Sequence, residues 1–287
     1  MPPSILTLVR GREQHLRNLM ESLAHQTVQP LELVIAWMQD EPFANLPKLD
    51  CPVRHIFVAG EPMPLAKARN AAAVAALGDT LIFLDVDCIA SPTLVEAFTN
   101  AAAREDGVFL GEVLYLPAGV ANTGVDYALF DQQGVRHPAK PAPPETGICA
   151  EPDHGELWGL SFAIRAATWR ALGGMDEAYV GYGGEETDFA AKLKENGIPL
   201  YWTGHARAYH QHHAVLSPPV HQFDHIIRNA ELFHARHGRW CMDYWLGQFQ
   251  ALDLIDWTKD TARIEVKRRP TAHDIEAARQ PDTALFS

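Results

Sequence analysis

Two aspartates separated by one residue are the first feature of this sequence that could do chemistry. Asp85-Val86-Asp87 follows directly on the apolar run 80–84, which has the pattern of a buried strand. Carboxylate oxygens in this arrangement can bind Mg²⁺ or Mn²⁺, ions that keep coordination positions open for substrate phosphates. Aspartate is also common in the turn that ends a strand. The motif alone therefore leaves a metal site and a simple turn equally open.

A glycine-rich loop that runs into an acidic helix start is the second such feature. Residues 181–188 read Gly-Tyr-Gly-Gly-Glu-Glu-Thr-Asp. Acidic residues in a first helical turn are what the helix dipole favours, but the dipole does not explain the glycines before them. Because glycine lets a backbone approach a ligand closely, the whole segment favours a functional site. Its candidate residues are Tyr182, Gly183, Gly184, Glu185, Glu186 and Asp188.

Histidines gather in the last third of the chain. Eight of the 14 histidines lie between His205 and His237, and the densest group is His210-Gln211-His212-His213. A site made of histidines alone would indicate zinc, whereas one imidazole beside the Asp-Val-Asp motif would complete a Mn²⁺ shell. If the strand continues, His210 and His212 share one of its faces.

Basic residues near the ends of predicted elements point to an anionic ligand. The chain is acidic, with 24 Lys and Arg against 36 Asp and Glu and a formal net charge of −12. That balance argues against broad binding of nucleic acid or of membrane surfaces. A local cluster could still hold a diphosphate. The candidates are Arg10, Arg12, Lys67, Arg69 and Arg207.

The first third of the chain alternates strand and helix patterns. The apolar periodicity predicts strands at 5–9, 31–37, 53–58 and 80–84, and helices at 13–25, 65–77 and 92–103. This order predicts an α/β fold with a mostly parallel sheet, whose ligands bind at the carboxyl ends of the strands. Both Arg10-Gly11-Arg12 and Asp85-Val86-Asp87 fall at such ends.

The rest of the chain is less regular. Residues 136–155 hold five prolines and are predicted to be a long loop without regular structure. Beyond them we expect a strand at 160–164, helices at 167–172 and 185–196, short strands at 200–202 and 207–210, and one or two helices within 221–257. No clear pattern follows residue 259.

Length and cysteine usage restrict the class of protein further. A chain of 287 residues can form one large domain or a domain with an appendage. The four cysteines are far apart and form no CxxC pair, which indicates reduced thiols. No apolar run reaches the roughly 18 residues needed to cross a bilayer, and the first residues show no signal peptide. We therefore expect a cytoplasmic protein, with peripheral membrane association left open.

Taken in order, these motifs resemble those of nucleotide-sugar glycosyltransferases with the GT-A fold, of the family 2 type. Asp85-Val86-Asp87 is identical to the metal motif of β-1,4-galactosyltransferases, and Ala68-Arg69-Asn70 is similar to a family 2 motif. Residues 8–12 resemble the first-strand segment beside the uridine nucleotide, and residues 158–164 resemble the strand that lines the donor sugar. Residues 181–186 are similar to Gly-Trp-Gly-Gly-Glu-Asp of the galactosyltransferase and chondroitin polymerase branch.

The resemblance implies a fold and a division of the chain. The fold would be a GT-A domain, a Rossmann-like, mostly parallel sheet flanked by helices, with a C-terminal helical extension. That domain would cover residues 1–215, with a nucleotide-binding part at about 1–116, the Pro-rich loop 136–155, and an acceptor and catalytic part at about 156–215. Residues 216–287 would form the extension packed on it.

The resemblance also implies roles for the candidate residues. Asp87 and His210 would bind the metal, with Asp85 near the metal and the ribose, and His212 and His213 remain alternatives to His210. Glu186, in place of the usual Asp, would be the catalytic base, Glu185 would bind sugar hydroxyls, and Asp188 completes the catalytic group. The donor would contact Arg10, Arg12, Lys67, Arg69, Asn70, Gly159, Tyr182, Gly183 and Gly184.

The implied reaction is an inverting transfer, dependent on Mn²⁺ or Mg²⁺, of a hexose or N-acetylhexosamine from a UDP-sugar to a hydroxyl. The acceptor would be a glycan, a lipid-linked sugar or a small molecule, as in polysaccharide biosynthesis, and no nucleic acid would be bound. A non-catalytic nucleotide-sugar-binding protein and a zinc metallohydrolase built on His210, His212 and His213 are the alternatives.

Overall fold

The computed structural model describes residues 2–286, and it is built around one large mixed sheet. One half of this sheet is parallel, with strand order β3-β2-β1-β4. Three of these strands are buried along their whole length, as expected for strands covered by helices on both faces. Their bounds are β1 Ser4–Val9, β2 Glu32–Trp37, β3 Val53–Phe57 and β4 Thr80–Leu84.

The other half of the sheet mixes strand directions. It continues from β4 in the order β9-β6-β10-β5, where β9 and β5 run antiparallel to their neighbours and β6 runs parallel to β10. The bounds are β5 Cys88–Ala90, β6 Val108–Tyr115, β9 Ser161–Arg165 and β10 Leu200–His210. The carboxyl ends of β6 and β10 lie side by side, because Tyr115 pairs with His210.

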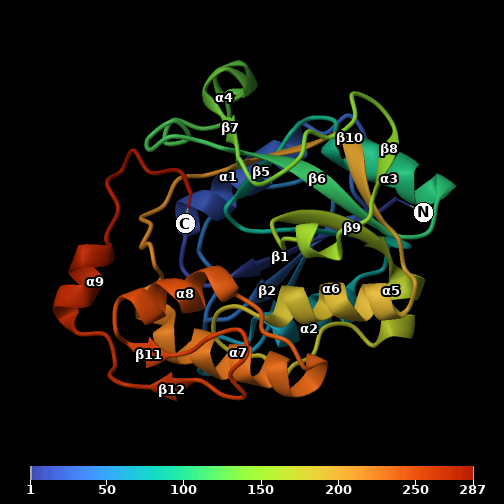
Figure 1. Cartoon of the computed structure of the whole chain (residues 1–287). Coiled ribbons are helices and arrows are strands. Elements are labelled where there is room, and N and C mark those ends of the chain that lie inside the picture. Colours follow the sequence, from blue (N-terminus) through green and yellow to red (C-terminus); the bar gives the residue numbers. More distant parts are fainter. Residues whose placement is uncertain (1, 287) are drawn as a thin grey trace.

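Helices cover both faces of the sheet (Figure 1). One face packs against α1 and α3, and the opposite face against α2, α5 and α6, so two separate apolar cores enclose the sheet. The bounds are α1 Glu13–Ala24, α2 Leu65–Ala75, α3 Leu94–Arg104, α5 Ala166–Leu172 and α6 Glu185–Glu195. These findings confirm the predicted α/β fold.

The last part of the described chain forms a helical layer with a core of its own. That core joins aromatic side chains of α7 and α8 to Tyr179, so the layer packs directly against the segment before α6. The bounds are α7 Phe223–His237, α8 Asp243–Ala251, α9 Ala272–Ala278, and the hairpin strands β11 Ile255–Asp256 and β12 Glu265–Val266. Within residues 2–286, no helix is both long and apolar enough to span a membrane.

Several sequence-based expectations were wrong in detail. The segment 136–155 is not free of regular structure, because it contains strand β8 (Ile148–Glu151), which pairs with β10. The two short strands expected at 200–202 and 207–210 are one strand, β10, with a register shift between Trp202 and Arg207. Strand β6 and helix α9 were not predicted. The remaining short elements are α4 Tyr127–Gln133, β7 Val135–Arg136, η1 His154–Glu156 and η2 Val220–Gln222. The proposed division at residue 215 stays a prediction.

Candidate functional site

Asp85 and Asp87 lie in the tight turn between β4 and β5. The backbone amide of Asp85 donates to the carbonyl of Leu160 (2.9 Å), and its carbonyl accepts from the amide of Cys88 (2.8 Å). The turn is thereby fixed to the residue that precedes β9. The Asp87 side chain is buried and that of Asp85 is partly buried, so burial acts on both carboxyl groups.

Asp87 is held by two basic side chains from the start of α1. Its Oδ1 lies 2.7 Å from His15 Nδ1, and its Oδ2 lies 2.7 Å from Arg12 Nη1. Burial alone would raise the pKa of Asp87, but the hydrogen bond from His15 and the charge of Arg12 lower it to about 2. Burial and the nearby charge of Asp87 raise the pKa of Asp85 to about 7. The turn thus favours one firmly ionised carboxylate, that of Asp87.

Asp87, His210 and His213 form a group that could hold a metal ion. One ligand atom from each of the three lies within 4.8 Å of the others. His210 ends β10 opposite Cys88, and burial lowers its pKa to about 3. Burial also lowers the pKa of His213, so burial favours in both imidazoles the neutral form, which is the form that ligates metals. Asp85 and His212 are not in this group, and His213, which was left open as an alternative to His210, lies in it together with His210.

The donor set of this group fits a borderline cation. One carboxylate and two imidazoles suit Mn²⁺ or Zn²⁺ better than Mg²⁺, which prefers oxygen ligands. Asp87 Oδ2 also lies 3.8 Å from His213 Nε2 while it pairs with Arg12. A bound cation would therefore compete with the Arg12 guanidinium for the same carboxylate oxygen.

A second pair of carboxylates opens α6. Arg69, from α2, bridges them: its Nη1 lies 3.2 Å from Glu185 Oε1, and its Nη2 lies 2.7 Å from Glu186 Oε1. The Glu185 side chain is 6% exposed and that of Glu186 is 28% exposed, so only Glu186 is open to a ligand. Burial and the neighbouring charge of Glu186 raise the pKa of Glu185.

Gly159 lies directly against this ion pair. A Cβ at position 159 would overlap Glu186 Oε1 and would lie 2.6 Å from Arg69 Nη2. Only glycine lets the backbone approach the two side chains this closely. The Leu160 carbonyl accepts the hydrogen bond of the Asp85 backbone amide, and Gly159 contacts the Glu186 side chain. The short segment Gly159-Leu160 therefore connects the Asp85–Asp87 turn to the start of α6.

The glycines before α6 pack against the C-terminal helical layer. Gly183 and Gly184 have φ values of 85° and 94°, and a Cβ at Gly183 would lie 2.6 Å from Met242 Sδ. The ring of Tyr182 contacts that of Trp245 at a centroid distance of 5.5 Å, and burial raises the pKa of Tyr182 to about 12. The loop is therefore shaped by its packing on α8, whatever ligand it also contacts.

The Asp188 side chain contacts the C-terminal helical layer, so we now expect it to lie outside the catalytic group. It lies two positions after Glu186 on α6, which turns its side chain about 200° away around the helix. Its Oδ1 accepts from the Tyr179 hydroxyl (3.1 Å) and lies 2.9 Å from His237 Nε2 of α7. Asp188 thus joins α6 to the C-terminal layer.

The other predicted ligand-binding residues are engaged elsewhere. Arg10 pairs with Glu61, and Lys67 is exposed on α2. The Asn70 amide donates to the Met175 carbonyl (2.8 Å). Arg207 lies 2.7 Å from a carboxylate oxygen of both Glu112 and Asp131. Of the predicted anion-binding residues, Arg12 and Arg69 are therefore the ones that the structure brings to the carboxylate pairs.

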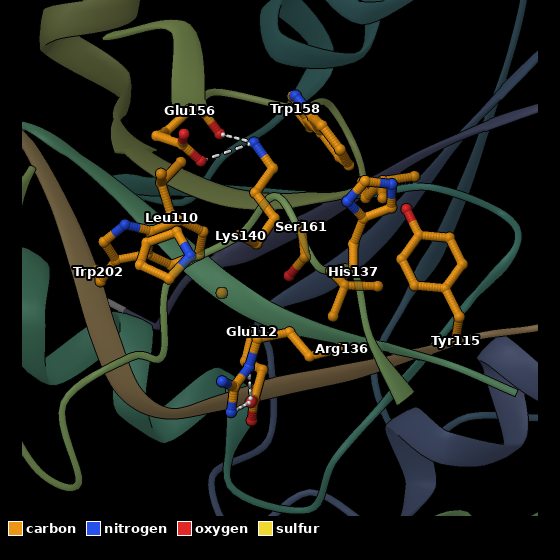
Figure 2. Close-up of a pocket in the computed structure, with 14 residues that line it drawn as sticks. Leu110, Glu112, Tyr115, Arg136, His137, Lys140, Glu156, Trp158, Ser161 and Trp202 are labelled. Atoms are coloured by element: carbon orange, nitrogen blue, oxygen red, sulfur yellow. Dashed lines mark hydrogen bonds and ion pairs between the residues drawn. The ribbon is translucent and has the colours of Figure 1, made fainter. Parts of the chain in front are cut away.

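A pocket lined by Leu160, which bonds to Asp85, and by Trp158, which precedes Gly159, opens where the pairing of β6 with β9 ends after Leu110 (Figure 2). Lys140 lies over the Trp158 ring at 3.6 Å and donates to Glu156 (2.9 Å). The Ser161 hydroxyl, which lines the pocket, is buried without a hydrogen-bond partner in the described chain. Aromatic walls with a few polar groups are usual in sites for small polar ligands.

Sequence analysis singled out residues 158–164, which include Trp158, Leu160 and Ser161 of this pocket, but it missed the other lining residues. Tyr115 ends the unpredicted strand β6, and its ring lies 4.7 Å from that of His210. His137 and Lys140 belong to the Pro-rich segment, whose composition indicated only a loop. Two lining residues lead to the candidate site: Tyr115 packs on His210, and Trp158 precedes Gly159, which packs on Glu186.

Two protein-family models match this chain. Residues 4–149, just over half of the chain, match the model of glycosyl transferase family 2. Residues 152–214 match a second model, described as the N-terminal domain of galactosyltransferase. These matches define the class of protein as that of the glycosyltransferase families. More specifically, the chain belongs to glycosyl transferase family 2 and carries a galactosyltransferase-like segment.

Solved structures show the same fold at low identity. A structure of GalNAc-T7 with UDP, GalNAc and Mn²⁺ matches with a TM-score of 0.55 and 18% identity, over 74% of this chain and 43% of that chain. A structure of residues 1–349 of TarS from S. aureus matches with a TM-score of 0.51 and 17% identity, over 82% of this chain and 65% of that chain. The present chain therefore spans less than two thirds of either structure. No curated protein sequence matches it.

Proposed function

We propose that the protein is a metal-dependent, inverting transferase that moves a hexose or N-acetylhexosamine from a UDP-sugar to a hydroxyl group. One observation carries this proposal. The segment Gly159-Leu160 accepts the backbone hydrogen bond of Asp85 through Leu160 and packs on Glu186 through Gly159, so it joins the turn of the candidate metal site to an accessible carboxylate. Transfer from a nucleotide sugar needs a place for the diphosphate and a base beside it.

The donor is inferred from the donor set of the site and from a structural neighbour. GalNAc-T7 is described with UDP, GalNAc and Mn²⁺. Asp87, His210 and His213 would hold such a cation here. When bound, the cation would supply positive charge to the leaving diphosphate. Because Mn²⁺ accepts imidazole ligands more readily than Mg²⁺ does, Mn²⁺ is the expected ion.

The chain's own residues supply the proton transfer. Glu186, partly exposed at the start of α6, would accept the proton of the attacking hydroxyl. Arg69 fixes the direction of the carboxylate through its 2.7 Å contact. Glu185 is buried behind Glu186, so it could contact donor hydroxyls only if Glu186 and Arg69 moved aside. We therefore assign Glu185 a positioning role.

A zinc hydrolase remains the second candidate, because one carboxylate and two histidines also form a zinc set. His212 is not in this set, so the group differs from the three-histidine site considered from the sequence. This candidate would be favoured if the purified protein held zinc tightly and if UDP did not change its melting temperature.

Thermal stability of the purified protein tests the proposal. The melting temperature is measured with MnCl₂ and a panel of UDP-galactose, UDP-N-acetylgalactosamine and UDP-glucose. Ligand linkage predicts a rise for the donor that the site accepts, and the rise requires Mn²⁺. Asp87→Ala should abolish it, whereas Asp243→Ala, at a partly exposed ion pair with Lys259, should keep it. No shift with any nucleotide would contradict the proposal.

A further inference from the structure

The chain beyond α9 returns to the active site. The last stretch, red in Figure 1, leaves the C-terminal helical layer and ends near the middle of the molecule. Arg279 forms an isolated β-bridge with Leu216, and the Gln280 amide donates to the carbonyl of Val215 (3.0 Å). The stretch is thus tied to the segment that directly follows His213.

Phe286 then lies on two rings of the pocket. Its ring meets that of Tyr115 edge-on at a centroid distance of 5.0 Å and that of His137 at 4.7 Å. Tyr115 and His137 both line the pocket, and the Tyr115 ring also packs on His210 of the candidate metal group. Phe286 therefore covers aromatic surface between that group and the pocket.

Little else fastens the residues between these two contacts. Pro281, Asp282 and Thr283 are exposed, and the Ala284 amide donates to the Pro281 carbonyl, a bond within the stretch itself. Among the described residues, the stretch 281–286 is fastened to the rest of the molecule mainly by the ring of Phe286, and it can open at small cost because an aromatic contact of this kind is modest.

The covered surface is suited to a sugar. Aromatic rings such as Tyr115, His137 and Trp158 offer flat apolar faces to the C–H groups of a pyranose, and the polar groups of the pocket can bind its hydroxyls. Trp158 is joined directly to Gly159, which packs on Glu186, so one residue of the chain links this aromatic surface to the proposed base.

We propose that residues 280–286 act as a latch whose Phe286 covers the acceptor-sugar subsite formed by Tyr115, His137 and Trp158. The acceptor must displace this latch to reach Glu186. This inference rests on the proposed function, since it concerns access to the same site. It assigns to Phe286 a gating role and to the pocket the acceptor, a saccharide.

Donor hydrolysis tests the latch without knowledge of the acceptor. In that reaction the oxygen of water bonds to the anomeric carbon, the bond from that carbon to the β-phosphate oxygen breaks, UDP leaves, and Glu186 takes the proton. UDP release is measured with MnCl₂ and the three UDP-sugars for the wild type, Phe286→Ala and Phe286→Tyr. A fourth protein ends at Gln280. Phe57→Ala, at a half-exposed ring on the edge strand β3, is the matched control. UDP affinity is measured by calorimetry in each protein.

We expect Phe286→Ala and the shortened chain to release UDP about three- to tenfold faster, as the loss of two aromatic contacts implies. Phe286→Tyr and Phe57→Ala should match the wild type, and UDP affinity should stay within about twofold in all proteins. If UDP binds but the rate in Phe286→Ala and in the shortened chain is unchanged, lower or undetectable, the latch is refuted, while UDP binding still supports the nucleotide-sugar site of the proposed function. If UDP with Mn²⁺ binds to none of the proteins, the proposed function itself fails.

Discussion

The Asp85–Asp87 turn and the Glu185–Glu186 pair in the first turn of α6 each place two carboxylates close together, but different basic residues hold them. Each brings two carboxylates together at partly buried positions, one at the end of a strand and the other at the start of a helix. In the first turn, Asp87 is buried and carries the contacts from Arg12 and His15. In the second turn, one arginine, Arg69, spans both carboxylates and leaves Glu186 the more exposed.

The difference separates two chemical tasks. An ionised, buried carboxylate beside two neutral imidazoles suits a cation, which would replace Arg12 and share the charge. An arginine-bound carboxylate that is open on one side suits proton transfer, because its direction is fixed while one oxygen stays reachable. The basic residues that the sequence suggested as phosphate ligands thus serve first to hold the protein's own carboxylates.

Replacing the proposed base gives the largest expected loss of activity. Glu186→Gln keeps the size of the side chain but cannot accept the proton, so kcat should fall by about 10²–10⁴. UDP affinity in Mn²⁺ and the melting temperature should stay near the wild type, because Asp87 is untouched. Steady-state kinetics and calorimetry measure these quantities. Glu195→Gln, at an exposed position of the same helix, is the control. Near-normal turnover in Glu186→Gln would show that the base lies elsewhere.

Removing the shared arginine should mainly cost stability. Arg69→Met leaves Glu185 buried without its partner, and breaking a buried ion pair in this way costs about 3–5 kcal/mol. Urea denaturation measures the change. Arg10→Met breaks a pair with Glu61 whose side chains are 39% and 72% exposed, so its cost should stay below about 1 kcal/mol. Equal losses in both variants would mean that Arg69 contributes no more than a surface charge.

The strands that position the Asp turn could be predicted from sequence, whereas β6 could not. Strands β1 and β4 are buried on both faces and read as continuous apolar runs. Strand β6 is interrupted in its middle by Gly111 and Glu112. A Cβ at Gly111 would lie 2.8 Å from Ser161 Oγ, and Glu112 is buried because arginines pair with it. Both residues are explained by contacts distant in sequence, which local patterns do not contain.

The candidate site also depends on contacts between residues that are distant in sequence. The carboxylates and His210 could be selected by type and spacing, but their partners could not, since Arg69 and Glu185 are 116 residues apart. His213 joins the metal group because the chain leaves β10 after His210, where strand alternation no longer applies. The direction of Asp188, by contrast, follows from helix periodicity and could have been predicted.

Adding one methyl group at Gly159 tests whether Glu186 needs its position. Gly159→Ala would push the Glu186 carboxylate and the Arg69 guanidinium aside. A displacement of about 1 Å in a reacting group can cost about 10² in rate. The expected result is such a fall in kcat with UDP affinity retained. Gly247→Ala, in α8 with no heavy atom within 4 Å of the added Cβ, should leave kcat unchanged. An unaffected kcat in Gly159→Ala would show that Glu186 tolerates movement and is not the base.

The smallest effect on kcat is expected at Asp188, which we expect to take part in neither cation binding nor proton transfer. Asp188→Asn keeps an oxygen for the Tyr179 hydroxyl but loses the charge that faces His237. We therefore expect a loss of about 1–2 kcal/mol in stability and a kcat within about twofold of the wild type. Urea denaturation and steady-state kinetics separate these two quantities. Asp243→Asn, at a partly exposed pair with Lys259, should change stability by less than about 0.5 kcal/mol. If Asp188→Asn lowered kcat as far as Glu186→Gln does while the protein stayed folded, α6 would contribute two carboxylates to the reaction. The face of α6 that packs on the C-terminal helical layer would then take part in catalysis as well.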